Sequence, residues 1–130
     1  MDARSHMNKS DASPVDVNRN TVVAKALLNA AEGLGLNGKV LAEVIGVSEA
    51  TLTRLKKNEA TLERKSYELS LYVIRLFRSL DAIVHGDTAA RQSWMTSYNT
   101  VLKNKPIDLI KKINGIILTC DYLDSRRSPI

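Results

Sequence analysis

The sequence of 130 residues predicts an all-α fold, and three observations support this prediction. Aromatic residues make up only 5% of the chain, so the core must be built from Leu, Ile, Val and Ala, which favours helix-on-helix packing. Apolar residues recur at the i, i+3, i+4 spacing of a helix face, and no segment shows the alternation of a strand. Capping residues and glycines separate the periodic segments, as expected for a succession of helices.

The N-terminal segment is expected to lie outside the fold. Residues 1–6 look like a cloning remnant, because a Ser-His-Met join is common at cloning sites. Residues 8–20 are polar, contain a proline and show no periodicity, which predicts a disordered arm.

The order of the helices follows from their end signals. The helices should cover residues 21–32, 37–45, 49–57, 66–84, 88–102, 106–114 and 116–124. Their N-termini are marked by Asn20, Asn37, Ser48, Asp87 and Pro106, and their C-termini by Gly33, Gly35, Gly46, Gly86 and Gly115. We therefore predict an arm at residues 1–20, a first domain at residues 21–85 ending in a long connecting helix, and a second small domain at residues 86–130.

The strongest motif lies at residues 41–55 and matches a helix-turn-helix. Two helices that cross through a tight turn need a small residue at the crossing, a turn residue that tolerates positive φ, a cap and apolar anchors. The sequence supplies these at the right spacing with Ala42, Gly46, Val47, Ser48, Leu52 and Leu55. A plain helical hairpin could carry Gly46 and Ser48 alone, but the full set favours the helix-turn-helix.

Such a motif would place the outer face of residues 48–57 in the major groove of DNA, and the net charge of +5 suits a polyanionic partner. Arg54 could pair with guanine and a threonine methyl could contact thymine, whereas lysines would contact phosphates. Glu49 fits the helix macrodipole better than a base contact. The candidate DNA-binding residues are Lys39, Ser48, Glu49, Ala50, Thr51, Thr53, Arg54, Lys56 and Lys57. A single helix-turn-helix contacts only a short stretch of DNA, so we expect a homodimer, formed through residues 66–84 or near Trp94.

The sequence lacks the patterns of an enzyme, a metal site or a membrane protein. Cys120 is the only cysteine, which excludes an internal disulfide and a thiolate zinc cluster and predicts a buried thiol. His85, at a helix end, has no partner for catalysis, and no glycine-rich phosphate loop occurs. No apolar run of about 18 residues and no signal peptide is seen. We expect a cytoplasmic, non-enzymatic protein without a cofactor.

The C-terminal part carries a second pattern. It consists of WMTSYNTVL at residues 94–102, KPIDLI at 105–110, Asn-Gly at 114–115 and Tyr-Leu-Asp at 122–124. This pattern resembles the toxin-binding domain of Xre/MbcA/ParS-type antitoxins over about residues 88–130, and the helix-turn-helix before it fits the two-part layout of that family. We assign the diagnostic residues to stability rather than to partner contact: Trp94, Asn99, Leu102, Pro106, Leu109 and Gly115.

The resemblance implies an antitoxin that neutralises a cognate toxin and represses its own operon by binding promoter DNA. In this family the toxin is often of the RES type, which consumes NAD or transfers ADP-ribose from it, and the C-terminal end of the antitoxin covers the active-site cleft. By this resemblance the candidate toxin-binding residues are Tyr122, Asp124, Arg126, Arg127, Ser128 and Ile130. An arginine pair can bind carboxylates of such a cleft, although it also fits a solvated basic tail.

Two other functions fit the same sequence. One is a homodimeric helix-turn-helix repressor whose C-terminal half only dimerises. The other is a protein-interaction module whose helix-turn-helix no longer binds DNA, since the positive charge of Arg54, Lys56 and Lys57 is modest and Glu49 offsets part of it. A toxin partner would separate the antitoxin from the repressor, and promoter binding would separate both from the module.

Overall fold

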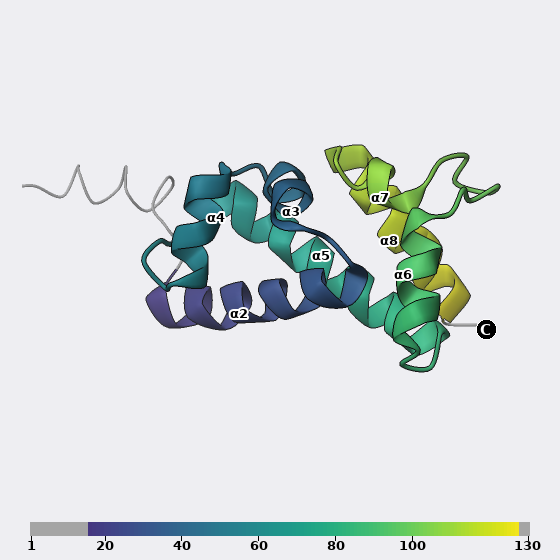
Figure 1. Ribbon diagram of the computed structural model, residues 1–130, viewed down its shortest axis with the longest axis horizontal. Helices are drawn as coiled ribbons and strands as arrows, with labels where there is room; N and C mark the ends of the chain where they lie inside the picture. Colours follow the sequence, from purple (N-terminus) through teal and green to yellow (C-terminus); the bar gives the residue numbers. More distant parts are fainter. Residues whose placement is uncertain (1–15, 128–130) are drawn as a thin grey trace, which may run out of the picture.

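The computed structural model describes residues 16–127, and this part of the chain is all-helical, as the sequence predicts (Figure 1). Its helices are α2 (Val17–Leu34), α3 (Gly38–Ile45), α4 (Glu49–Lys56), α5 (Arg64–Ile83), α6 (Thr88–Thr96), α7 (Pro106–Leu109) and α8 (Ile113–Arg127). The cloning remnant, most of the predicted arm and the toxin-binding candidates Ser128 and Ile130 lie outside the described residues. Within residues 16–127, no helix is long and apolar enough to cross a bilayer.

Helix α5 runs through the centre of the molecule and packs against helices from both halves of the chain (Figure 1). Helices α2 and α3 from the N-terminal half of the chain contact α5, and so does α8 from the C-terminal half. One hydrophobic core contains buried residues of both halves, from Leu27 and Ile45 to Met95 and Ile116. The two halves are therefore joined by a shared helix and a shared core.

Helix α2 begins four residues earlier than the sequence suggested. Asp16 caps it, with a carboxylate oxygen accepting a hydrogen bond from Arg19 N at 3.1 Å. The assignment of Asn20 as the cap is wrong: Asn20 is buried inside the helix, and its Oδ1 accepts a hydrogen bond from Leu62 N at 2.7 Å. Asp and Asn cap helices about equally well, so capping preference does not distinguish Asp16 from Asn20. The hydrogen bond from the distant Leu62 amide is what places Asn20 inside.

Two glycines that were expected to end helices lie inside them. A Cβ on Gly33 of α2 would lie 2.4 Å from Phe77 Cε1, and a Cβ on Gly115 of α8 would lie 1.9 Å from the carbonyl oxygen of Leu109. Both glycines therefore permit close helix packing. Gly35, at φ 79°, is the residue that ends α2.

Helix α6 ends at Thr96, although the apolar pattern predicts a helix to residue 102. The side chain of Asn99 accepts hydrogen bonds from the backbone amides of Val101 and Leu102, both at 2.9 Å. These bonds give the backbone an alternative to the helix, which explains the early end. As a result, Tyr98 and Val101, which lie in the segment predicted to be helical, are each 63% exposed.

Candidate functional site

The turn between α3 and α4 has the geometry that the sequence predicts for a helix-turn-helix. Gly46 adopts φ 76°, and the amides of Gly46 and Val47 both donate to the carbonyl of Ala42, at 2.9 and 3.0 Å. Ala42 is only 3% exposed, so a larger side chain would separate the helices. The expected caps Asn37 and Ser48 accept hydrogen bonds from the amides of Val40 and Thr51. These predictions are confirmed.

Helix α4 is anchored on one face and open on the other. Leu52 and Leu55 are buried, whereas the residues on the opposite side of the helix are exposed. This exposed side consists of Ala50, Thr53, Arg54 and Lys57, with Glu49 at its edge in the first turn. The hydroxyl of Thr53 donates to the carbonyl of Glu49 at 3.1 Å, so its methyl group remains for an apolar contact.

Three of the candidate DNA-binding residues are engaged in local structure. The hydroxyl of Ser48 accepts the amide of Thr51 at 3.0 Å and lies 3.0 Å from the Thr51 hydroxyl, to which it donates. Arg54 Nη2 in turn donates to Thr51 Oγ1 at 3.3 Å. The three side chains form a short chain of hydrogen bonds along α4 that orients the Arg54 guanidinium.

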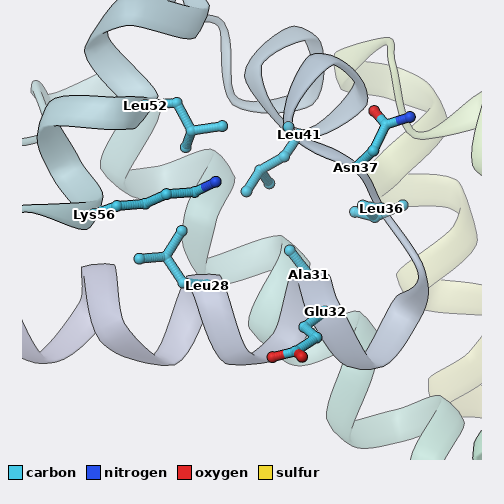
Figure 2. Close-up of a pocket in the computed structure, with 9 residues that line it drawn as sticks. Leu28, Ala31, Glu32, Leu36, Asn37, Leu41, Leu52 and Lys56 are labelled. Atoms are coloured by element: carbon cyan, nitrogen blue, oxygen red, sulfur yellow. The ribbon is translucent and has the colours of Figure 1, made fainter.

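Lys39 and Lys56 lie at the sides of the motif. Lys39 is exposed in the first turn of α3. Figure 2 shows Lys56 extending from α4 between Leu52 and Leu28, beside a pocket of about 400 Å³ that α2, α3 and α4 enclose. The aliphatic stem of Lys56 therefore covers apolar side chains, which leaves only its ammonium group for a polar partner.

The candidate residues on α8 are held against α5. Arg75 forms an ion pair with Asp124, and Arg75 Nε donates to Asp124 Oδ2 at 2.8 Å. The buried hydroxyl of Ser79 donates to Asp124 Oδ1 at 2.6 Å and accepts from Arg127 Nη1 at 3.0 Å. The hydrogen bond from Ser79, with help from Arg75, lowers the pKa of Asp124 below its ordinary value, and the hydrogen bond to Asp124 raises the pKa of Arg75. Asp124 and Arg127 thus have a structural role that the sequence did not reveal.

Tyr122 and Arg126 form a second contact along α8. The Arg126 guanidinium lies over the ring of Tyr122, 5.6 Å from its centroid, a distance typical of a cation–π contact. Tyr122 is half-buried and packs against the core, whereas Arg126 is exposed. Arg126 is therefore an exposed toxin-binding candidate that has no contact with α5 among those described for Asp124 and Arg127.

Sequence reasoning missed Arg91, which joins the two halves. Its side chain is buried, with 8% exposed, and its Nη1 lies 2.5 Å from Asp81 Oδ1. Its Nε donates to the carbonyl of Gly33 at 2.7 Å, and its guanidinium lies 5.0 Å from the centroid of the Phe77 ring. A single arginine in a short polar helix gives no sequence signal of such a role, because the partners are up to 58 residues away.

His, Cys, Asp and Glu are the side chains that could hold a metal ion or supply a nucleophile. Within residues 16–127, no three His, Cys, Asp or Glu side chains gather as a metal site would require. Cys120 is buried, as expected, and its burial raises the pKa of the thiol to about 12. Such a thiol stays protonated at neutral pH and is a poor nucleophile.

Comparison with protein families agrees with this geometry. Residues 13–75 match the family of the antitoxin Xre-like helix-turn-helix domain. Residues 79–128 match the family of the antitoxin Xre/MbcA/ParS C-terminal toxin-binding domain. No curated protein matches the chain significantly. The two matches follow one another in the expected order and meet within α5, and together they show that the chain belongs to the Xre-type antitoxins of toxin–antitoxin systems.

Proposed function

We propose that this antitoxin binds the promoter of its own operon through α4 and neutralises an NAD-consuming toxin of the RES type through its C-terminal part. It acts by binding, so the proposal includes no catalytic step. We keep the division into a DNA-binding part at residues 21–85 and a toxin-binding part at residues 86–130, with α5 connecting them.

The outward face of α4 is the observation that carries the proposal for DNA. Arg54 can donate two hydrogen bonds to guanine in the major groove, and the Thr53 methyl can contact the methyl of thymine. Lys57 follows the last residue of α4, where its ammonium group can meet a phosphate, and Lys39 and Lys56 can do the same at the sides of the motif. Ser48 and Thr51 would act by orienting Arg54. Two copies of the chain would then read two half-sites about 34–36 Å apart.

The C-terminal end of α8 supports the proposal for the toxin. Arg126 is exposed in the last turn, and the contacts of Asp124 and Arg127 with α5 hold this turn in place. Residues 128–130, which follow it, can then enter a cleft of the toxin. A cleft that binds a dinucleotide and its products is lined by polar groups. The cationic and polar groups of the antitoxin can form hydrogen bonds with these groups of the cleft.

One co-expression experiment tests both parts. The antitoxin gene is expressed together with the gene beside it, and two quantities are measured: cellular NAD and the activity of a reporter placed behind the operon promoter. Arg54→Ala combined with Lys57→Ala should abolish repression and leave NAD at its normal level. Truncation after Arg127 should leave repression intact but let cellular NAD fall. It removes residues 128–130 and keeps the Asp124 and Arg127 contacts.

A matched variant separates the effect of the site from the effect of net charge. Lys25→Ala combined with Arg78→Ala also removes two positive charges, from exposed positions on α2 and α5, and should leave repression unchanged. With purified protein, the single change Lys57→Ala should reduce the slope of log K against log salt concentration by about 1. Unchanged repression by the Arg54 and Lys57 variant would exclude α4 as the DNA-binding element. NAD that stays normal when the neighbouring gene is expressed alone would exclude an NAD-consuming toxin.

A further inference from the structure

Large apolar side chains are exposed on the loop that connects α6 and α7. Tyr98 and Val101 are each 63% exposed, although both residue types are usually at least partly buried. They lie three residues apart in a loop of nine residues, 97–105. Exposed apolar side chains held close together are typical of a surface that binds another protein.

The loop that carries them is firmly built. Asn99 and Asn104 form a bridge, in which Asn99 N donates to Asn104 O at 3.0 Å. The Asn99 side chain holds two further amides, and Lys103, at φ 62°, closes the loop. Leu102, which follows Val101, is buried, so the loop has one apolar side chain turned inward beside the exposed ones. These hydrogen bonds order the backbone while Tyr98 and Val101 face solvent. Because the loop is already ordered, it loses less conformational entropy when a partner binds.

A hollow lies at the base of the loop. It has a volume of about 210 Å³ and is lined by Asn104, Leu109, Lys112, Gly115 and Leu118, among others. Pockets for small molecules measure about 300–1,000 Å³, so this hollow is better sized for one side chain of a protein. Leu118 of α8, which lines the hollow, is 51% exposed and adds an apolar side chain at its edge.

The rim of this surface is mostly basic. Lys103 and Lys105 are exposed on the loop itself and Lys112 lines the hollow, whereas the acidic side chain among the residues that line it, Asp108, is paired with Lys111. A partner with an apolar centre and carboxylates around it would match both the centre and the rim. We propose that the loop of residues 97–105, together with this hollow, docks the toxin on an apolar surface bordered by acidic groups.

The toxin fits this surface better than a second copy of the chain does. The loop lies inside residues 79–128, which match a toxin-binding domain. In a two-fold symmetric contact through the loop, each copy would bring its own lysines close to those of the other, and like charges repel. The proposal rests on the proposed function, and it adds a docking surface separate from the C-terminal end of α8.

The test measures the affinity of the purified antitoxin for the purified product of the neighbouring gene. The double variant Tyr98→Ser, Val101→Ser should bind it about 30- to 100-fold more weakly, because a central aromatic side chain carries a large share of the affinity. The matched control is Val17→Ser, Val22→Ser, which removes two valines that are each 68% exposed on α2. This control should bind like the unchanged chain. Circular dichroism melting should give the same midpoint for all three proteins.

A second variant tests the charge of the rim without touching the apolar side chains. Lys103→Glu combined with Lys105→Glu should slow association, and the loss should shrink as salt is added. Should the unchanged chain and both serine variants bind equally well, the docking surface is wrong while the antitoxin function stands. Should the loop variant turn a dimer into a monomer with unchanged toxin affinity, the occupant is a second copy and the proposal is overturned. If the unchanged chain does not bind the neighbouring product at all, both proposals fall.

Discussion

The helix-turn-helix and the C-terminal helices are stabilised by contacts of very different range along the chain. In the helix-turn-helix, Asn37 binds the amide of Val40, Ser48 binds the amide of Thr51, and Gly46 donates to Ala42. Each of these contacts joins residues three or four positions apart. In the C-terminal part, by contrast, Arg91 reaches Gly33 across 58 residues, and Asp124 reaches Ser79 across 45.

This difference shows that the two halves of the described chain are not independent units joined by a linker. The C-terminal part obtains its main hydrogen bonds from α2 and α5, and α5 is also the helix on which the helix-turn-helix packs. Changes at the buried tertiary contacts of the C-terminal part should therefore affect the whole molecule. Changes at a cap or a turn of the helix-turn-helix, or at an exposed ion pair, should have a smaller, local effect.

The largest effect is expected at Gly115. Gly115→Ala should lower the free energy of unfolding by at least about 3 kcal/mol, because its Cβ would lie 1.9 Å from a carbonyl oxygen of the backbone, which cannot move away easily. Urea unfolding measures this change. The control is Gly46→Ala, where no atom lies within 4 Å of the new Cβ and only the φ of 76° is unfavourable, at a cost of about 1–2 kcal/mol. A Gly115→Ala protein more stable by about 1 kcal/mol would show an ordinary helix position without close packing.

An intermediate effect is expected at Arg91. Arg91→Ala should lower the free energy of unfolding by about 2–3 kcal/mol, since it removes the buried partner of Asp81 and of the Gly33 carbonyl. The cost stays below that of a fully buried ion pair because the Asp81 side chain is 37% exposed and can be hydrated. Arg78→Ala, at an exposed position of α5, serves as the control and should change stability by less than about 0.5 kcal/mol. Equal, small losses for both variants would contradict the role of Arg91 in joining the halves.

The smallest effect, and the one that depends on pH, is expected at Asp124. Its pKa in the folded protein lies below its ordinary value, so its ionised form stabilises the fold above the unfolded pKa of about 3.9, and this contribution is lost as the pH falls through the folded pKa. Asp124→Asn should therefore cost about 1 kcal/mol or less at pH 7, because the Asp124 and Arg75 side chains are 35% and 42% exposed. The cost should shrink as the pH falls below about 4 and disappear below the folded pKa. Thermal melts from pH 2.5 to pH 8 measure it, with Asp121→Asn, whose side chain is 66% exposed, as the control. A difference that does not change with pH would contradict the role of the Asp124 charge.

Much of the fold could be predicted from short sequence patterns. The caps Asn37, Ser48 and Asp87, the turn at Gly46 and the position of Pro106 at the start of α7 are all as expected. The same patterns identified which side of α4 faces outward. The assignment of DNA-binding and toxin-binding residues stays a prediction, because those contacts form only with a partner.

The sequence by itself therefore predicted most of the helices and the helix-turn-helix, since these depend on caps, turns and periodicity within a few residues, and the family followed from its resemblance to the Xre/MbcA/ParS-type antitoxins. Only the tertiary structure decided that Asn20 turns inward, that Gly33 and Gly115 lie inside helices and that Tyr98 and Val101 face solvent. The tertiary structure also gave Arg91, Arg75 and Ser79 their partners. The physical reason is that each of these outcomes, except for the loop, depends on an atom more than five residues away. In the loop, the hydrogen bonds of the Asn99 side chain outweigh the helical pattern of its apolar neighbours.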